Sequence, residues 1–496
     1  MTRMHDSPIA VAMIVALACG TETPATQETG TGNGPTTDDL PSTGVVDTST
    51  AGSATEATSG VMTTTMSGPD LDSSSGDGPK FDVGGIDDMD NGGCIGHETD
   101  ATLTGTVYGP DGELPVSGAL VYVTPDMPAG IPQQVYCAAC TELGCDADET
   151  LSNADGSFSL PAASGQDKYL VVQKGQFLRI TPLDIAPGPA AINDAITTLP
   201  SANDPDNGEY IPLIAVGDGS YDRLEDALGK FGMGDTVIQN FEERLVPGTE
   251  TFALWDNGQD PGLDGFASQG TFDELISDPT ALDDYHIIFV PCSTDDYTDA
   301  LGNPQNVQNI RDWVAAGGRW YVSDWSNEWL QLVFPEYQDL ASWDGSVGSA
   351  DNGPYDSLAD VNDDDLLAWL EALPAQFGDI NPLNDEPHPT LGQLPQVMTV
   401  DNWSGITQTL QVMADDGKGG MVDVSHKVWL EGPGGDPAAI HPLTVTGQFG
   451  CGKLQFTSYH TAEFFDYVGL SPQELVLLYT ILEIGSCQEP LPPPEG

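Results

Sequence analysis

The segment GGRWYVSDWSNEWL, residues 317 to 330, predicts a helix end, a short apolar strand and a sharp exit into a polar loop rich in Trp. Residues 303 to 318 before it predict a helix, because Asn-Pro starts the segment, apolar residues recur at helical spacing and Gly-Gly ends it. The strand RWYV follows directly. A helix that leads into an apolar strand is the repeating unit of an α/β fold.

Further units of this type flank the segment on its N-terminal side. Residues 208 to 233 predict a strand, a turn and an amphipathic helix with apolar positions at i, i+4 and i+7. Residues 251 to 256 and 285 to 292 predict two more apolar strands. The alternation favours a flavodoxin-like α/β domain over residues 208 to 488, with a mostly parallel sheet covered on both faces.

The C-terminal part predicts a hairpin over residues 441 to 460 and a last helix over residues 471 to 485. Ser471 and Glu474 form a capping box at the start of this helix. The helix is roughly 22 Å long, and the preceding strand rises roughly 23 Å. If the helix runs back along the strand, Cys487 meets Cys451, and we expect a disulfide between them.

Residues 94 to 200 predict a small antiparallel β-sandwich, because short alternating strands are separated by turn signals such as GPDG. The pattern LTGTVYGPDG, PVSGALVYV, TLSNADGSFSLP and YLVVQKG resembles the carboxypeptidase regulatory-like domain. This resemblance implies a transthyretin-like sandwich. It also implies a non-catalytic role as a rigid spacer or a binding unit.

The N-terminus predicts export. Residues 1 to 18 combine Arg3 with a short apolar run, as in a secretory signal, and the following Cys19 resembles a bacterial lipoprotein box. We expect a lipid on Cys19; a soluble exported protein with a spare thiol is the alternative. Residues 19 to 93, rich in Thr, Ser, Gly and Asp, predict a disordered stalk, and residues 489 to 496 a disordered tail. The expected location is the outer membrane or the cell surface.

The first domain carries four nearby cysteines, namely Cys94, Cys137, Cys140 and Cys145. In an exported chain we expect two disulfides among them, with a structural metal or a redox pair as alternatives. Their connectivity has three possibilities, and the spacing does not choose. Cys292 then remains as the unpaired thiol.

The charge balance excludes some partners. The chain has 13 basic and 77 acidic residues, a formal net charge of -64. Nucleic acid is excluded as a partner, because its binding requires Lys and Arg to displace phosphate counterions. We expect membrane contact only through a lipid anchor, and divalent cations remain possible ligands.

The order of elements from residue 208 to 487 resembles the class I glutamine amidotransferase-like fold, and especially its trehalose-utilisation-type branch. That family places a Cys nucleophile after the strand that corresponds to RWYV. Here Ser323 and Asp324 stand at the matching positions, so the resemblance implies a domain without its nucleophile. Cys292 ends the preceding strand, where the family has a Gly-rich loop, and we expect a buried thiol there.

A serine-based site is the catalytic alternative. Ser323 as nucleophile, His460 as base and Asp324 or Asp218 as the orienting acid would all lie near the carboxyl ends of strands. The flanking residues of Ser323 are not the small ones of a nucleophile elbow. We therefore favour chance proximity, with His460 bonding to a strand end. Trp325 and Trp329 lie at i and i+4 and could pack, form a lid or offer a platform for a sugar.

Residues 360 to 371 predict either a calcium loop or an acidic helix start. Calcium-loop positions 1, 3, 5 and 12 would hold Asp360, Asn362, Asp364 and Glu371. Asp365 occupies the position that requires Gly, so we favour the helix start.

These observations predict a surface-exposed lipoprotein that binds a ligand or presents a folded module, with a degenerate amidotransferase-like domain. The expected partner is a protein or a carbohydrate. No cofactor is expected, with calcium left open. One alternative is an extracellular hydrolase acting on carbohydrate or amide substrates, and a second is a calcium-dependent adhesion protein.

Overall fold

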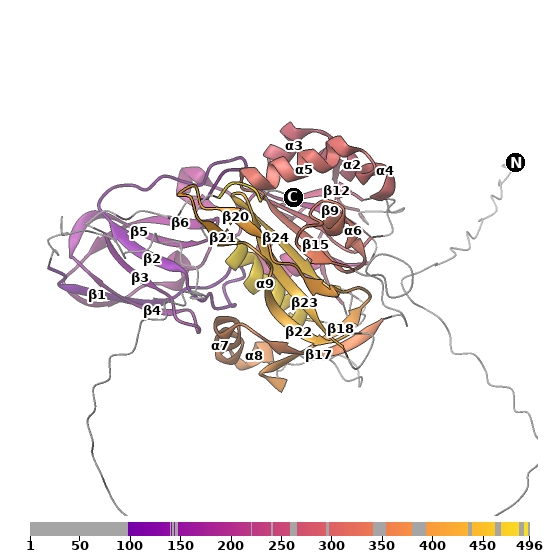
Figure 1. Cartoon of the computed structure of the whole chain (residues 1–496). Helices are drawn as coiled ribbons and strands as arrows, with labels where there is room; N and C mark the ends of the chain where they lie inside the picture. Colours follow the sequence, from indigo (N-terminus) through magenta and orange to yellow (C-terminus); the bar gives the residue numbers. More distant parts are fainter. Residues whose placement is uncertain are drawn as a thin grey trace, which may run out of the picture. The chain divides into compact units, whose positions relative to one another are not determined.

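The computed structural model describes residues 98–138, 140, 143, 147–219, 221–239, 242–257, 265–293, 297–340, 354–378, 393–434, 439–461, 468–485 and 491–494, which belong to one compact unit (Figure 1). The predicted signal peptide, the lipidated cysteine and the stalk lie outside the described residues, as do Cys94, Cys145 and Cys487. In the described part of the chain, no helix is long and apolar enough to cross a membrane.

The first region, residues 98 to 210, contains two small sheets, drawn in purple in Figure 1. In the first sheet, β1 pairs antiparallel with β4 and parallel with β7. The second sheet has the order β3-β2-β5-β6-β8 and is antiparallel throughout. The strands are β1 Ala101–Thr106, β2 Leu120–Thr124, β3 Asp148–Leu151, β4 Ser157–Ala162, β5 Gly165–Lys174, β6 Phe177–Ile185, β7 Gly188–Ala191 and β8 Glu209–Tyr210.

The two small sheets share one hydrophobic core. Leu103 and Leu160 of the first sheet and Val121 and Val172 of the second belong to the same buried cluster. The alternation of apolar residues that predicted these strands places every second side chain in this core.

The second region is built on a sheet of order β13-β12-β9-β14-β15-β24-β23-β22-β17-β18. Its strands are β9 Ile214–Asp218, β12 Ala253–Asp256, β13 Ser268–Thr271, β14 Ile287–Val290, β15 Arg319–Ser323, β17 Tyr355–Val361, β18 Gln396–Asn402, β22 Lys427–Pro433, β23 Ile440–Phe449 and β24 Gly452–Thr457. Smaller ladders join β10 Thr236–Gln239 to β11 Glu242–Leu245, β16 Gln338–Asp339 to β19 Gln408–Thr409, and β20 Met413–Asp415 to β21 Met421–Asp423.

The large sheet is mixed, whereas the sequence predicted a mostly parallel one. All pairings from β13 to β24 are parallel, as the alternation of strands and helices requires. All pairings from β24 to β18 are antiparallel, because the hairpin β23–β24 reverses the chain and three further strands extend it. Two of those strands come from residues 354 to 402, where the sequence predicted none.

Helices cover both faces of the parallel half, as predicted. Ile287 and Phe289 point into a core shared with α1, α7 and α9, while Ile288 and Val290 point into a core shared with α2, α3 and α5. The helices are α1 Leu224–Leu228, α2 Phe272–Ser277, α3 Pro279–Asp283, α4 Tyr297–Leu301, α5 Pro304–Ala316, α6 Glu328–Gln331, α7 Asp364–Ala372, α8 Ala375–Gly378 and α9 Pro472–Ile484. A π-helical segment, Gly229–Met233, follows α1, and 3-10 turns span Asp194–Ile196, Pro205–Asn207 and Asp324–Ser326.

Helix α9 confirms the predicted C-terminal helix and its capping box. The Ser471 hydroxyl accepts the Glu474 N–H, and the Glu474 carboxylate accepts the Ser471 N–H. At the other end, Arg319 donates to the Gly485 carbonyl at 3.2 Å and Lys453 to the Glu483 carbonyl at 3.2 Å. Two cations therefore satisfy carbonyls at the negative end of the helix dipole.

The first region packs directly on the second. Lys174 of β5 forms a buried ion pair with Glu483 of α9. The Trp369 indole of α7 donates to the Pro115 carbonyl at 2.8 Å, and the rings of Phe177 and Phe231 meet edge to face. The two predicted domains therefore share one continuous core.

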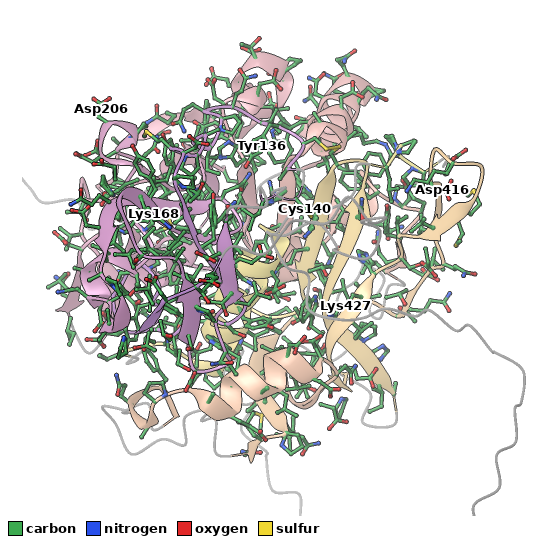
Figure 2. All side chains as sticks on the ribbon, turned by 90° about the vertical axis from the view of Figure 1, so that its left-hand side faces the viewer. Tyr136, Cys140, Lys168, Asp206, Asp416 and Lys427 are labelled. Atoms are coloured by element: carbon green, nitrogen blue, oxygen red, sulfur yellow. A yellow bond between two sulfur atoms is a disulfide. The ribbon has the colours of Figure 1, made fainter. Side chains whose placement is uncertain are left out.

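A loop of the first region, residues 132 to 137, runs along the amino edge of the parallel strands. The Val135 N–H donates to the Asp283 carbonyl at 2.7 Å, and the ring of Tyr136, a residue labelled in Figure 2, meets the His286 ring edge to face. A Cβ at Gly317 would lie 2.0 Å from the Tyr136 carbonyl oxygen. Gly317, which ends α5, thus also leaves the space that this loop occupies.

The disulfide at the end of this loop differs from the predicted ones. Cys451 is bonded to Cys137, not to Cys487, across a sequence separation of 314 residues. The Cys451 N–H donates to the Ala315 carbonyl, so the β23–β24 turn lies beside the end of α5, where the 132–137 loop also passes. Cys137 therefore does not pair within the local group of four. Cys140 is disulfide-bonded too.

The end of the chain also differs from the predicted disordered tail. Leu491 is buried and belongs to the core that contains α5.

The Cys137–Cys451 bond predicts a large stabilisation. Cross-linking so long a loop lowers the entropy of the unfolded chain, and loss of the bond should cost about 3–5 kcal/mol. Replacing both cysteines with Ala and measuring the free energy of unfolding in urea tests this value. A peptic digest at low pH, which prevents disulfide exchange, should yield a peptide pair linking residues 137 and 451. A pair that links residues 451 and 487 would refute the assignment.

His426 predicts a loss of stability in mild acid. Its Nε2 lies 2.9 Å from the Gln338 side-chain oxygen, and burial lowers the pKa of His426 to about 4. An unfolded histidine titrates near 6.5, so stability is full above that pH and falls as the pH falls toward 4. Between pH 7 and pH 5 the loss is about 2 kcal/mol.

Urea unfolding of wild type and His426→Gln at both pH values measures this loss. The variant keeps a hydrogen-bonding group without a titrating ring, and its stability should change less between the two pH values. An identical pH dependence in both proteins would contradict the prediction.

Candidate functional site

The parallel strands of the large sheet end at one edge and bring polar residues together there. β9 ends at Asp218, Cys292 follows β14, Ser323 and Asp324 lie at the end of β15, and His460 follows β24. All of these side chains are buried. The strands themselves are apolar and covered on both faces, so polar groups gather where the strands end.

Asp324 stands at a sharp turn directly after β15. Its φ is 45°, in the left-handed region, which costs most non-glycine residues about 1–2 kcal/mol and which Asp tolerates better. The Trp403 N–H donates to Asp324 Oδ1 at 2.9 Å, and the Ser404 hydroxyl donates to the Asp324 carbonyl at 2.8 Å. Two contacts from residues 403 and 404 thus hold this backbone conformation.

Asp324 and His460 form a buried ion pair. Asp324 Oδ2 lies 2.8 Å from His460 Nε2, and the side chains are 0% and 1% exposed. Burial raises the pKa of Asp324 to about 6, while the charge and the hydrogen bond of His460 act in the opposite direction. The pair is therefore closed to water, and an ionised Asp324 depends on a protonated His460 beside it.

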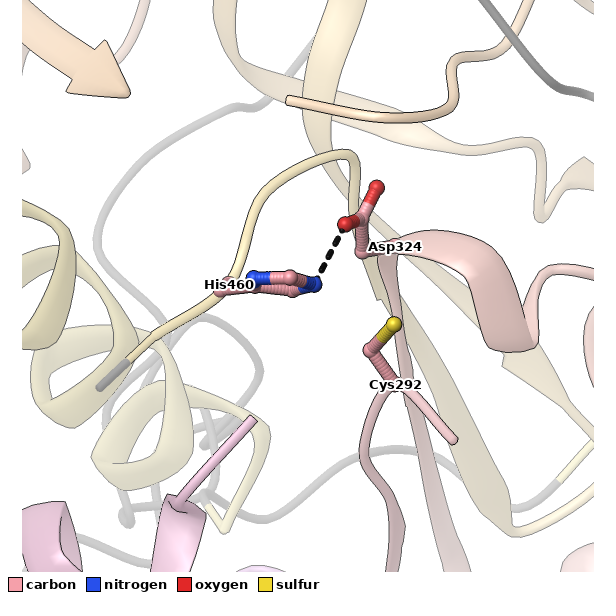
Figure 3. A group of neighbouring side chains, drawn as sticks. All are labelled: Cys292, Asp324 and His460. Atoms are coloured by element: carbon pink, nitrogen blue, oxygen red, sulfur yellow. Dashed lines mark ion pairs between the residues drawn. The ribbon is translucent and has the colours of Figure 1, made fainter. Parts of the chain in front are cut away.

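Cys292 completes a group of three with this pair (Figure 3). One donor atom from each of Cys292, Asp324 and His460 lies within 4.8 Å of the others. Cys292 is buried and is not part of a disulfide, and its N–H donates to the Ser323 hydroxyl at 3.0 Å. Thiol, imidazole and carboxylate thus converge from the ends of β14, β15 and β24.

Ser323 is bonded away from the imidazole. Its hydroxyl donates to Asp222 Oδ2 at 2.6 Å and accepts the Cys292 N–H. Asp222 Oδ1 accepts the N–H and the hydroxyl of Thr461, next to His460. The Ser323 hydroxyl therefore donates its hydrogen to the Asp222 carboxylate. A Ser-His-Asp site would require this hydroxyl to donate to His460 instead.

Asp218 lies within a second group of buried acids. Burial raises the pKa of Glu225 well above its usual value, and the charges of Asp218 and Asp226 raise it further. The Leu245 N–H donates to Asp226 Oδ1 at 2.7 Å. Asp218 thus faces the start of α1, while Asp324 is the acid that contacts His460.

The acidic segment 360–371 is a strand end followed by a capped helix. Asp360 lies in β17 and accepts a hydrogen bond from Gln396, while Asp364 and Glu371 lie in α7 and Asn362 lies between the two elements. The cap is Asp363, which accepts the Leu366 N–H and pairs with Lys427 at 2.6 Å. The favoured sequence interpretation, an acidic helix start, agrees with this arrangement.

The two tryptophans of the opening segment have different surroundings. Trp329 is buried and packs against Phe272 and Trp320. Trp325 is half-buried and stacks on Trp403, with ring centroids 5.6 Å apart. Trp329 therefore belongs to the core, while the stacked pair Trp325–Trp403 lies beside the Asp324 turn.

The chain matches no protein-family model and no curated protein. A buried Asp–His pair with a thiol alongside can serve as a structural ion pair, as a nucleophile–base arrangement, or as a set of metal ligands.

Sequence reasoning named Asp324 and His460 but gave Cys292 and Asp222 no place in the site. Cys292 carried no motif spacing with His460, which lies far along the chain. Asp222 follows β9 in a polar turn and resembles many other acids of this chain. Only the order of the strands in the sheet brings these residues to one edge, and that order is difficult to predict from a single sequence.

The buried pair predicts a large effect of charge removal. Asp324→Asn keeps the side-chain size and tolerates the left-handed conformation, but it leaves His460 without a charged partner. We expect a loss of about 3 kcal/mol in unfolding free energy at pH 7. Asp324→Ala should cost about 1 kcal/mol more, because Ala does not tolerate φ of 45°.

Asp401 provides the matched control. Its φ is 53°, and it is half-buried and lies outside the pair. Asp401→Asn should be nearly neutral, and Asp401→Ala should show the backbone cost alone. Urea unfolding of the four variants separates the two contributions, and an Asp324→Asn variant as stable as wild type would disprove the role of the pair.

Proposed function

We propose that this protein is a lipid-anchored, surface-exposed protein that binds a ligand or presents a folded module without catalysing a reaction. The observation that carries the proposal is the position and the burial of Asp324. It occupies the turn after β15 and follows Ser323, and the resemblance to the class I glutamine amidotransferase-like family implies that the nucleophile would lie at these two positions. Its two carboxylate oxygens contact His460 and the Trp403 N–H, and it is fully buried.

The finer fold assignments form part of the proposal. The two small sheets with a common core support a transthyretin-like sandwich of the carboxypeptidase regulatory-like type. The parallel half of the large sheet, with helices on both faces, supports an amidotransferase-like, flavodoxin-like α/β domain. Such a module can retain its scaffold after its chemistry is lost.

The export assignment rests on the sequence. A signal of residues 1 to 18, Cys19 and the polar segment up to residue 93 support a lipid anchor and a tether. A net charge of -64 keeps such a module soluble and away from anionic surfaces. The disulfide between Cys137 and Cys451 suits an oxidising compartment.

The proposed ligand is a carbohydrate or a protein that contacts the Trp325–Trp403 pair. Both rings are half-buried and stacked, beside a turn fixed by hydrogen bonds. Rigid aromatic surface with few polar groups is typical of ligand sites.

A hydrolase is the second candidate, and the position of Cys292 favours it. If the site opened, His460 could take the thiol proton and Asp324 could orient the imidazole, which is the arrangement of a cysteine nucleophile. The serine-based version and calcium-dependent adhesion have no such support, because Ser323 bonds to Asp222 and the acidic segment forms a helix start.

Thiol labelling of the native protein distinguishes the two candidates. We expect iodoacetamide to modify Cys292 in the folded mature protein at least a hundredfold more slowly than in urea, because the thiol is buried and its thiolate is not exposed. Intact mass and peptide mapping measure the adduct. His460→Gln serves as the matched variant. Rapid native labelling that this variant abolishes, together with His460-dependent hydrolysis of ester or amide substrates, would favour the hydrolase.

A further inference from the structure

The spacing of the three donor groups at the sheet edge suits a small metal ion. The Cys292 sulfur, an Asp324 oxygen and a His460 nitrogen all lie within 4.8 Å of one another. Ligands bound at about 2.0–2.3 Å to a tetrahedral zinc lie about 3.3–3.7 Å apart. The present His460–Asp324 contact of 2.8 Å would need to widen by only about 0.5 Å to admit the ion between them.

Hydrogen bonds fix the side chain of Asp324 and the main chain of His460 and Cys292. Trp403 donates to the Asp324 oxygen that does not face His460. Gln473 of α9 donates to the His460 carbonyl at 2.6 Å, and the Cys292 N–H is bonded to Ser323, which is bonded to Asp222. Supporting bonds of this kind orient ligands in metal sites. A chance encounter of three side chains does not require them.

The charge at this edge also favours a cation. Asp324 is fully buried and His460 is its ion-pair partner. Buried carboxylates are expensive unless they are paired or coordinate a metal. A divalent ion would balance the carboxylate and a thiolate together.

We propose that Cys292, Asp324 and His460 bind one zinc ion that stabilises the carboxyl edge of the large sheet. A thiolate with an imidazole and a carboxylate is a zinc ligand set, whereas calcium and magnesium take oxygen ligands. Binding releases two protons to solvent, the thiol proton of Cys292 and the Nε2 proton of a protonated His460, so that a thiolate and a neutral imidazole bind the ion. The proposal is independent of the proposed ligand-binding function, because the ion lies among buried residues and serves the fold.

The test uses the full exported protein, purified without a metal-affinity step, with zinc and cobalt as probes. We expect one zinc per chain after dialysis and a higher melting temperature with zinc than after chelation. Cobalt should give a thiolate-to-metal charge-transfer band. This band is the decisive readout, because the 77 acidic residues of the chain also attract divalent ions weakly and cannot produce it.

Two ligand variants and one control complete the experiment. Cys292→Ser should abolish the cobalt band and weaken zinc binding at least tenfold, and His460→Gln should weaken zinc binding similarly. His426→Gln, which alters a buried histidine bonded to Gln338 in another part of the sheet, should keep the band. If the ligand variants do not fold, wild type still decides. A folded wild type with neither a cobalt band nor a zinc-dependent melting temperature would overturn the proposal, as would a band that persists in Cys292→Ser.

Discussion

The burial of helix α9 is the constraint on which the rest of the described structure depends. Residues 472 to 482 are buried on every side, and the polar ones among them are bonded to a different element each. Gln473 bonds to the His460 carbonyl, Glu474 pairs with Lys230 after α1, and Thr480 accepts from Gln455 of β24. Because these groups cannot reach water, each partner must be present before the helix can pack. The sheet, the first region and the site are therefore stabilised together.

This arrangement explains how a strongly acidic chain stabilises buried charge. The few basic side chains lie where an acid or a helix end needs them, as Lys174, Arg319 and Lys453 do near the C-terminus of α9. At the opposite edge of the sheet His460 faces Asp324, and it is a cation only when it is protonated. A histidine is charged only when it is protonated, so the charge at this edge depends more strongly on pH than the charge at the other edge.

Local sequence signals predicted the helices and strands well. The disulfide and the candidate site depended on long-range packing, which these signals do not describe. The Ser471 capping box and the Asn303–Pro304 start gave α9 and α5 their first turns, because these signals act within a few residues. The partner of Cys451 depended on a loop of the first region that packs beside Gly317. The Cys292–Asp324–His460 group depended on strand order. Both arise from contacts between segments far apart along the chain, which helical or strand periodicity does not encode.

The bond between Cys137 and Cys451 changes how the molecule responds to proteases. A single cut of the backbone anywhere between residues 138 and 450 leaves two pieces that remain joined through sulfur. The shared core of the first region and the large sheet holds the same pieces together without covalent help. A nick in an exposed loop would therefore leave the protein in one piece, and fragments would separate only after both reduction and unfolding.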